Sequence, residues 1–404
     1  MFDVNKIREQ FPILKRKVND KDLVYFDNGA TTQKPQSVID AVSNYYQEEN
    51  ANVHRGVHFL SGLATDKFEE TRNTIQQFIG AKHNHEIIFT KGTTESINLV
   101  ANGFRSLLKK GDEIIISGLE HHSNIVPWQM CCELSGATLK VIPLLDNGSL
   151  DMENFNNLLS KNTKLVAVSH VSNTLGTINP IEEIIEKSHT VGAKVLIDGA
   201  QAASHICLNM QELDADFYCF SAHKMYGPTG VGVLYGKEEI LNTLPPYQGG
   251  GEMIKEVSFE KTTYASLPYK FEAGTPNIAA VIAFKSAIDF ITELGVENIS
   301  KYEDELLQYA TSEILKIEGV KIYGTSKNKS GIISFNIEGI HPYDIGTIVD
   351  KMGIAIRTGH HCTQPIMKRY NIPGTVRISL AAYNTKAEVD ICINAIKKAQ
   401  EMLS

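Results

Sequence analysis

Residues 217–224 read Phe-Tyr-Cys-Phe-Ser-Ala-His-Lys, an apolar run that passes into polar side chains. A short, continuous apolar run is typical of a buried strand. Lys224 follows this predicted strand directly. A lysine held in a pocket loses its proton more readily and becomes an amine nucleophile that forms Schiff bases. Lys224 is therefore a candidate catalytic residue, although this stretch alone also fits an ordinary surface lysine in a loop.

A second predicted strand, residues 194–197, runs into Asp198 in the same way. In open α/β sheets, ligands bind at the carboxyl ends of the strands. A buried carboxylate needs a cationic partner, and the protonated ring nitrogen of pyridoxal phosphate is such a cation. A Schiff-base lysine with an aspartate on the ring nitrogen is the arrangement expected for this cofactor. The pair of Lys224 and Asp198 therefore indicates a pyridoxal phosphate site.

Ser221 and Lys224 also fit the pattern S-x-x-K, and residues 334–336 and 357–359 follow in an order that loosely imitates the penicillin-binding serine enzymes. In those enzymes the serine opens a helix, and the third element is Lys-Thr-Gly on a strand. Here Ser221 ends a predicted strand, and Arg357 leads into a loop. Because short patterns recur by chance, we interpret this match as accidental.

The chain has 404 residues, which is beyond the size at which a single core usually keeps growing. One large domain with a smaller companion is therefore expected. The chain has 39 basic and 47 acidic residues, a formal net charge of −8, and no long basic run. These features argue against nucleic acid and against a membrane surface as partners, and they favour a small ligand.

The first ten residues carry acids early and lack an apolar core, so no secretory signal is expected there. No apolar run approaches the length of a bilayer span. The six cysteines form no C-x-x-C pair and no disulfide framework. We expect a cytoplasmic protein with reduced thiols, in which every cysteine except Cys362 is an ordinary core residue.

A rhythm of strand, polar turn and helix recurs along the first part of the chain. Predicted strands at residues 87–89, 113–117 and 165–169 each pass into a polar turn. Alternating strands and helices favour a mostly parallel sheet with helices on both faces. No G-x-G-x-x-G motif follows the first strand, so a dinucleotide is not indicated. The predicted fold class is α/β.

Several polar turns carry candidate site residues. Thr93 and Thr94 open a predicted helix, where free N–H groups and the helix dipole favour a phosphate, and an N-cap by either threonine is the alternative. His121 follows the strand 113–117 and is placed to stack on a flat ring, with a structural histidine as the alternative. Residues 27–32 and 52–58 are also polar, and each fits an ordinary solvated loop equally well.

The character of the sequence changes after Pro245. A polar stretch to Lys270 predicts a surface loop, and a helical pattern over residues 279–294 can bridge to a second domain. We expect an N-terminal segment, residues 1–20, that packs with the small domain, a large cofactor-binding domain over residues 21–265, and a small C-terminal domain over residues 266–404. The closing helix of the small domain has a capping box, Thr385 with Glu388.

Cys362 lies in a polar loop that also contains a glycine and two histidines. A reactive thiolate is expected in such surroundings. A zinc site is the rival, but two adjacent histidines and one cysteine do not easily complete a tetrahedron, so no metal is predicted. Arg377 lies inside a predicted strand and is either a solvated face residue or the fork that binds a substrate carboxylate.

Four motifs together resemble the pyridoxal-phosphate-dependent cysteine desulfurases, which belong to the class-V aminotransferase-like enzymes. They are residues 221–224 (Ser-Ala-His-Lys), 198–201 (Asp-Gly-Ala-Gln), 120–128 (Glu-His-His-Ser-Asn-Ile-Val-Pro-Trp) and 357–362 (Arg-Thr-Gly-His-His-Cys). The last motif resembles the group II, Suf-type branch. The resemblance covers nearly the whole chain. It implies fold type I of the pyridoxal-phosphate enzymes and a homodimer with active sites at the subunit interface.

The resemblance also implies roles for individual residues. Lys224 would form the Schiff base, Asp198 would pair with the ring nitrogen, and His121 would stack on the ring. The expected cofactor-binding residues are Thr93, Thr94, His121, Asn173, Asp198, Gln201, Ser221, His223, Lys224 and Thr275, of which Thr275 would reach in from the other subunit. The expected substrate-binding residues are Arg377 and Asn173 at the carboxylate, and Arg357 and His54 along the pocket.

The implied reaction is the conversion of L-cysteine to L-alanine. Lys224, Cys362 and His121 are the expected catalytic residues: Lys224 would move the α-proton, and the thiolate of Cys362 would attack the substrate sulfur and carry it as a persulfide. The sulfur would pass to a sulfur-acceptor protein of the Suf pathway for iron-sulfur cluster assembly. A selenocysteine lyase or another pyridoxal-phosphate lyase of the family is the alternative, and a non-enzymatic sulfur-carrying scaffold is a third.

Overall fold

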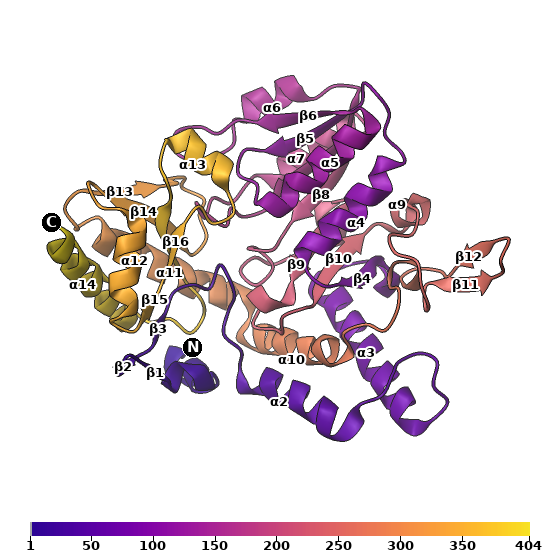
Figure 1. Cartoon of the computed structure of the whole chain (residues 1–404), viewed down its shortest axis with the longest axis horizontal. Helices are drawn as coiled ribbons and strands as arrows, with labels where there is room; N and C mark the ends of the chain where they lie inside the picture. Colours follow the sequence, from indigo (N-terminus) through magenta and orange to yellow (C-terminus); the bar gives the residue numbers. More distant parts are fainter. Residues whose placement is uncertain (1) are drawn as a thin grey trace.

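The structure is a computed structural model that describes residues 2–404 (Figure 1). Its centre is a seven-stranded sheet with the order β4-β10-β9-β8-β7-β5-β6. Neighbours from β9 to β6 run parallel, and β10 is antiparallel to both β4 and β9. The strands are β4 (Ile87–Thr90), β5 (Glu113–Ser117), β6 (Thr138–Ile142), β7 (Thr163–Ser169), β8 (Lys194–Asp198), β9 (Phe217–Ser221) and β10 (Gly232–Gly236). The predicted α/β class with a mostly parallel sheet is confirmed.

Both faces of this sheet are covered by helices, because its strands are apolar on both sides. In β9, Tyr218 and Phe220 belong to one hydrophobic core, and Phe217 and Cys219 belong to the other. This two-sided burial explains why β9 reads as a continuous apolar run in the sequence. The helices packed around the sheet are α2 (Gln36–Asn44), α3 (Phe59–Phe78), α4 (Thr93–Arg105), α5 (Val126–Ser135), α6 (Met152–Leu158), α7 (Ile181–Thr190), α8 (Met210–Leu213), α9 (Glu238–Thr243) and α10 (Ile278–Leu294).

A second, antiparallel sheet with the order β13-β14-β17-β16 lies toward the C-terminus (Figure 1). Its strands are β13 (Val320–Tyr323), β14 (Ile332–Ile337), β16 (Arg357–Gly359) and β17 (Thr375–Ser379). A separate core joins it to α11 (Val296–Ile314), α12 (Pro342–Asp350) and α14 (Lys386–Leu403), while α13 (Gln364–Tyr370) follows the Cys362 loop. The predicted capping box of α14 is present, with Thr385 and Glu388 each bonded to the other's backbone.

The N-terminal residues contact both cores. Helix α1 (Val4–Glu9) contributes Ile7 to the core of the large sheet. Strand β3 (Val24–Tyr25) instead pairs with β15 (Ile354–Ala355), and Phe26 lies in the core of the C-terminal sheet. Between these elements lie β1 (Lys17–Val18) and β2 (Lys21–Asp22). The turn that follows β3 is therefore held between the two cores.

Two expectations were wrong in detail. The predicted surface loop after Pro245 contains a hairpin, β11 (Ile254–Val257) with β12 (Thr262–Tyr264), which projects from the body of the molecule (Figure 1). Its strands are short and mostly exposed, so they lack the apolar alternation that marks a strand in sequence. The thiol of Cys207, expected in a core, belongs to an exposed residue.

None of the described helices combines the length and the apolarity that a membrane crossing requires.

The turn before α4 depends on a close backbone contact. A Cβ atom on Gly232 of β10 would lie 2.4 Å from Cα of Gly92, the residue that precedes α4. We predict that Gly232→Ala lowers the free energy of unfolding by about 1–3 kcal/mol, because the added methyl overpacks this contact. Thermal or urea unfolding measures the effect. The matched control is Gly249→Ala, whose methyl would have no atom of the described part of the chain within 4 Å. Equal stability of the two variants would contradict this interpretation.

Candidate active site

The carboxyl ends of β7, β8 and β9 meet at one edge of the large sheet. The register pairs Ser169 with Asp198 and Asp198 with Cys219, so the segments that follow these strands lie side by side. A cavity of 330 Å³ opens there. Its lining residues are Gly29, Ala30, Thr93, Thr94, His121, Ser123, Ser169, Val171, Asn173, Asp198, Ala200, Gln201, Ser221, His223, Lys224, Arg357, His361, Cys362 and Arg377. Most of the predicted site residues are thus brought together.

Lys224 ends the short helical turn η5 (Ala222–Lys224) directly after β9. Burial lowers the pKa of its amine from 10.5 to about 8, and Arg377 and Arg357 act in the same direction, while Asp198 and Cys362 oppose them. A substantial fraction of the amine is therefore neutral near physiological pH. The surface-loop alternative for Lys224 is wrong, because the residue lines the cavity.

Asp198 is the buried last residue of β8. One of its oxygens, Oδ1, accepts a hydrogen bond from the backbone N–H of Ala200 at 2.9 Å. Burial raises the pKa of Asp198, and Lys224 partly counteracts this shift. Within residues 2–404, no side chain donates a hydrogen bond to this carboxylate, so it retains the capacity to pair with a cationic N–H inside the cavity.

The first turn of α4 borders the same cavity. Ser221 Oγ accepts a hydrogen bond from the backbone N–H of Thr93 at 2.8 Å and lies 2.8 Å from Thr93 Oγ1. Gly92 is the N-cap residue and makes no side-chain cap bond, so the alternative of an N-cap by Thr93 or Thr94 is wrong. The side chains of Thr94 and His223 also line the cavity here. Hydroxyl groups at a helix N-terminus suit a phosphate.

His121 lies on the segment after β5, next to the turn η4 (His122–Asn124). Its Nδ1 accepts a hydrogen bond from the backbone N–H of Ser123 at 3.1 Å, which places the ring proton on Nε2. Burial and the neighbouring Lys224 lower the pKa of His121 to about 4. The ring is therefore neutral at physiological pH.

Cys362 lies in the short loop between β16 and α13. Both His361 and Cys362 have positive φ angles, 51° and 58°, a conformation that is strained for residues with a Cβ. The loop is held from the other core: the amide of Asn173 donates to the His361 carbonyl at 2.8 Å, and the N–H of His122 donates to the Cys362 carbonyl at 2.9 Å. The thiol is thus presented to the cavity by a backbone that both cores fix.

Arg377 lies on β17 with its side chain 2% exposed. Its Nη1 donates to the Asn173 carbonyl at 2.7 Å, and its Nη2 donates to Asp27 Oδ1 at 3.1 Å. Its buried Nε has no partner among the described residues. Arg357 pairs with the other oxygen of Asp27 at 3.2 Å. The solvated-face alternative for Arg377 is therefore wrong, and the two guanidinium groups form one cationic corner.

The turn at residues 27–32 contributes more to the site than the sequence indicated. Besides Asp27, its Gly29 accepts a hydrogen bond from Gln201 Nε2 at 2.7 Å. A Cβ on Gly29 would lie 3.2 Å from the guanidinium carbon of Arg377, so the turn packs closely on that side chain. The available signal was its position, a polar turn directly after a strand, which is also the position of Asp198.

Two predicted residues lie elsewhere. The Nε2 of His54 bonds to Glu69 Oε1 at 2.9 Å, and Thr275 lines a separate groove of 470 Å³. Neither residue lines the cavity that contains Lys224. Their roles in the site remain predictions. In residues 2–404, no group of three or more His, Cys, Asp or Glu side chains is arranged to hold a metal ion.

The lowered pKa of Lys224 makes its reactivity testable. A neutral amine is the reactive form, and its fraction rises as the pH passes through the pKa, here about 8 instead of 10.5. We predict that Lys224 in cofactor-free protein is modified by a small aldehyde and a reductant with a midpoint near pH 8. Peptide mass spectrometry measures the extent of modification at each pH. Exposed lysines serve as the reference, because an ordinary lysine titrates at about 10.4.

Because Asp198 raises the pKa of Lys224, Asp198→Asn should move the midpoint of modification to lower pH. A wild-type midpoint near that of the reference would contradict the prediction.

Comparisons with known proteins identify the family of the chain. Residues 24–392 match the family model described as aminotransferase class-V. The chain is 48% identical over 405 residues to a cysteine desulfurase of Escherichia coli, with 100% of both chains covered. It is 50% identical to a probable cysteine desulfurase of Mycolicibacterium paratuberculosis, of which it covers 59%.

A solved structure of the cysteine desulfurase CsdA from Escherichia coli superposes with a TM-score of 0.93 at 37% identity, covering 100% of both chains. The chain spans 59, 64 and 66% of the length of three mycobacterial and cyanobacterial relatives, and 99–100% of the enterobacterial ones. The chain therefore belongs to the aminotransferase class-V family.

Proposed function

We propose that this protein is a pyridoxal-phosphate-dependent cysteine desulfurase that converts L-cysteine to L-alanine and carries the sulfur as a persulfide on Cys362. One observation carries the proposal. A single cavity brings together the amine of Lys224, the carboxylate of Asp198 and the thiol of Cys362, which come from three distant segments of the chain. An amine, an anion and a thiol are the groups that this reaction needs.

The residues of the cavity fit the cofactor. The turn before α4, with Thr94, Ser221 and His223, would hold the phosphate, and the free oxygen of Asp198 would pair with the ring nitrogen. The neutral ring of His121 would lie against the cofactor ring, and Gln201 and Asn173 would address its hydroxyl. When bound, pyridoxal phosphate supplies an electron sink for negative charge at the substrate's α-carbon.

The cationic corner would bind the carboxylate of L-cysteine. The buried Nε of Arg377 has no partner within the described chain, and a carboxylate oxygen would satisfy it. Arg357, which is more exposed, would cover the other side. This binding would orient the substrate so that Lys224, with a pKa of about 8, can take up and return the α-proton near neutral pH.

Cys362 would then act on the substrate sulfur. Its thiolate attacks that sulfur, so a new S–S bond forms while the bond between the substrate's sulfur and Cβ breaks. The electron pair of the broken bond stays on the three-carbon fragment, which takes up a proton and leaves as alanine. The persulfide remains on the half-buried Cys362, where an acceptor thiol can reach it.

We also propose the finer assignments that the motif at residues 357–362 supports. They are membership of the group II, Suf-type branch, transfer of the sulfur to an acceptor protein of the Suf pathway for iron-sulfur cluster assembly, a homodimer, and a cytoplasmic location. We also propose the division into residues 1–20, 21–265 and 266–404: the separate cores of the two sheets support two domains, although α10, within residues 266–404, packs in the core of the large sheet. Helix α10 packs on α2 and α3 and would connect the two larger parts.

We predict that Cys362→Ala keeps the visible cofactor band and lowers alanine and sulfide release from L-cysteine by about a thousandfold or more, because no other thiol of the described residues, 2–404, lines the cavity. The assay quantifies both products under reductant. Cys207→Ala, which removes an exposed thiol outside the cavity, is the matched control and should be fully active.

Wild-type rates in Cys362→Ala would contradict the desulfurase mechanism. Activity of that variant with selenocysteine but not with cysteine would instead favour the selenocysteine lyase alternative. Protein that binds no pyridoxal phosphate at all would favour the sulfur-carrying scaffold.

A further inference from the structure

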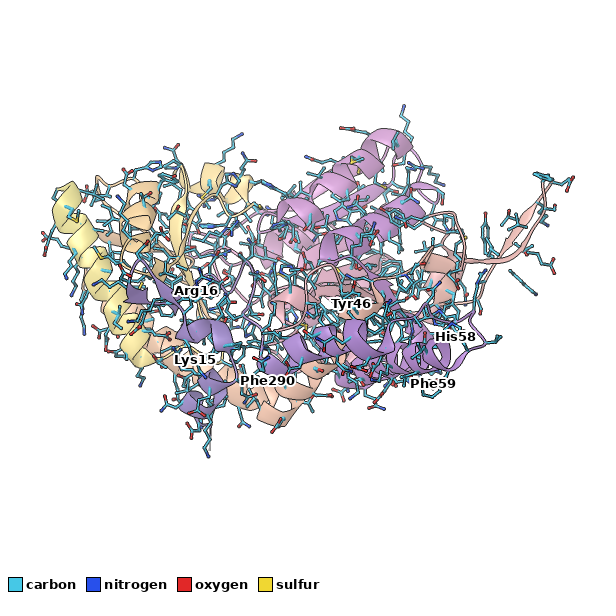
Figure 2. The ribbon with its side chains drawn as sticks, turned by 60° about the horizontal axis from the view of Figure 1, so that its bottom comes forward. Lys15, Arg16, Tyr46, His58, Phe59 and Phe290 are labelled. Atoms are coloured by element: carbon cyan, nitrogen blue, oxygen red, sulfur yellow. The ribbon has the colours of Figure 1, made fainter. Side chains whose placement is uncertain are left out.

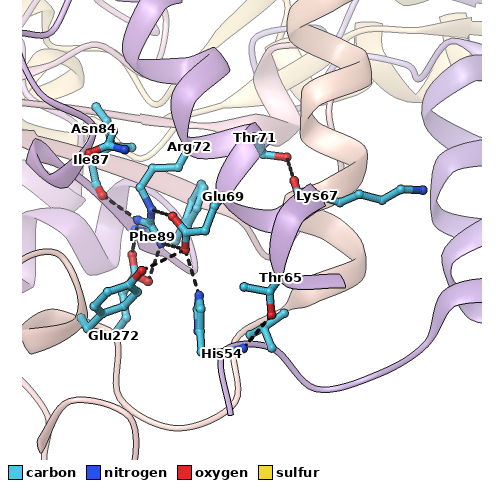
Figure 3. A network of polar contacts seen from close by, with 12 residues as sticks. His54, Thr65, Lys67, Glu69, Thr71, Arg72, Asn84, Ile87, Phe89 and Glu272 are labelled. Carbon is cyan, nitrogen blue, oxygen red and sulfur yellow. Dashed lines mark hydrogen bonds and ion pairs between the residues drawn. The ribbon is translucent and has the colours of Figure 1, made fainter. Parts of the chain in front are cut away.

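His54, one of the two predicted site residues that lie outside the cavity, is bonded to a cluster of charged side chains that also holds Glu272, three residues before Thr275 (Figure 3). Its centre is Arg72 on α3, with a side chain that is 1% exposed. The guanidinium makes hydrogen bonds with Glu69 at 2.8 and 3.2 Å and with Glu272 at 2.7 and 2.9 Å. The remaining donor reaches the Ile87 carbonyl at 2.7 Å. All five N–H donors of Arg72 are thus satisfied.

Glu69 extends this cluster to His54. The ring Nε2 of His54 donates to Glu69 Oε1 at 2.9 Å, since a carboxylate only accepts. Burial alone would raise the pKa of Glu69, but its hydrogen bonds with His54 and Arg72 lower it to about 2. His54 has a positive φ of 69°, a conformation that needs support from its surroundings. The fixed carboxylate of Glu69 supplies that support.

Glu272 extends the cluster to Thr275. This carboxylate also accepts a hydrogen bond from the backbone N–H of Phe89 at 2.7 Å, so it is anchored to β4 as well as to Arg72. Thr275 follows three residues later. The ring centroid of Tyr269, which lies in the same segment six residues before Thr275, is 5.0 Å from that of His54, so this segment also contacts His54 directly.

The surface beside the cluster has the composition of a protein interface. Val57 and Phe59, just after His54, are 104% and 80% exposed, and Phe259 at the tip of the β11–β12 hairpin is 108% exposed. Figure 2 shows Phe59 with Tyr46 and His58 on the face that carries α2 and α3. Val57 and Phe59 follow His54 directly in the chain, so apolar side chains next to the cluster are open to contact with a second copy.

We infer that Arg72, Glu69 and Glu272 form a positioning unit that acts across the subunit interface. The unit holds His54 and the segment of Thr275 in one rigid arrangement and presents them to the cavity of a second copy of this chain. This inference rests on the proposed homodimer and its cofactor. It explains why the two residues expected in the site lie outside the cavity of their own chain.

The test uses a neutral version of the unit, the triple variant Glu69→Gln, Arg72→Met, Glu272→Gln. Removing all three charges together leaves no unpaired buried charge, which favours normal folding. Glu70→Gln is the control: Glu70 is the next residue on α3 but is 59% exposed and pairs with Lys285 instead. The homodimer of the triple variant should have a turnover about tenfold or more below that of the wild type, and it should lose the cofactor band on desalting. The Glu70→Gln control should keep the wild-type turnover and the cofactor band.

Mixed dimers then show in which subunit the unit acts. In the first, one subunit carries the triple variant and the other carries Lys224→Ala, so the remaining Lys224 faces the intact unit of its partner. In the second, one subunit carries all four substitutions and the other is wild type. Each is purified through two different affinity tags. A dimer of wild type with Lys224→Ala sets the level expected for one working site.

We expect the first mixed dimer to match that reference, at about half the wild-type turnover and one retained cofactor band per dimer, and the second to be about tenfold lower. The reverse result would place the action of the unit within its own chain and overturn the inference. A monomeric wild-type protein, or a fully active triple homodimer, would overturn it as well. If the wild type released no alanine, the proposed function would fail, but cofactor retention in the two mixed dimers would still test the unit.

Discussion

The register between β8 and β9 is the constraint on which the rest of the site depends. Parallel pairing sets Asp198 opposite Cys219, so the buried carboxylate ends one strand while its neighbour leads into Ser221 and Lys224. A one-residue slip of β9 would move Tyr218 and Phe220 into the core that Phe217 and Cys219 now fill, so both cores would have to repack around side chains of different size. Core packing therefore fixes the placement of the amine relative to the carboxylate, although neither group contributes to the core.

The second requirement is that two separate cores present their groups to one cavity. The large sheet supplies Lys224 and Asp198, and the C-terminal sheet supplies Arg377 and the Cys362 loop. Asn173 joins the two sides: its amide binds the His361 carbonyl, and its own carbonyl accepts from Arg377. The strained backbone at His361 and Cys362 is held by these contacts, so the thiol's position is set by both halves of the protein.

Local sequence patterns were enough to predict part of this arrangement. Continuous apolar strands predicted the α/β sheet, and polar residues at strand ends predicted the edge where Lys224 and Asp198 meet. Patterns of this kind do not report pairings between distant segments. The bonds of Asp27 to Arg357 and Arg377 join opposite ends of the chain, and no local signal distinguishes Asp27 from an ordinary turn residue. For the same reason, the sequence did not reveal that Arg72 links His54 to the segment of Thr275.

The measurement that decides whether Lys224, Asp198 and Cys362 act together is the visible spectrum of the reconstituted protein before and after L-cysteine, with alanine and sulfide quantified in the same sample under reductant. The geometry of the cavity predicts a visible band from the lysine-bound cofactor that shifts on addition of cysteine, together with equal amounts of alanine and sulfide. A band that shifts without alanine would contradict the role of Cys362, and reconstituted protein with no band would contradict the roles of Lys224 and Asp198.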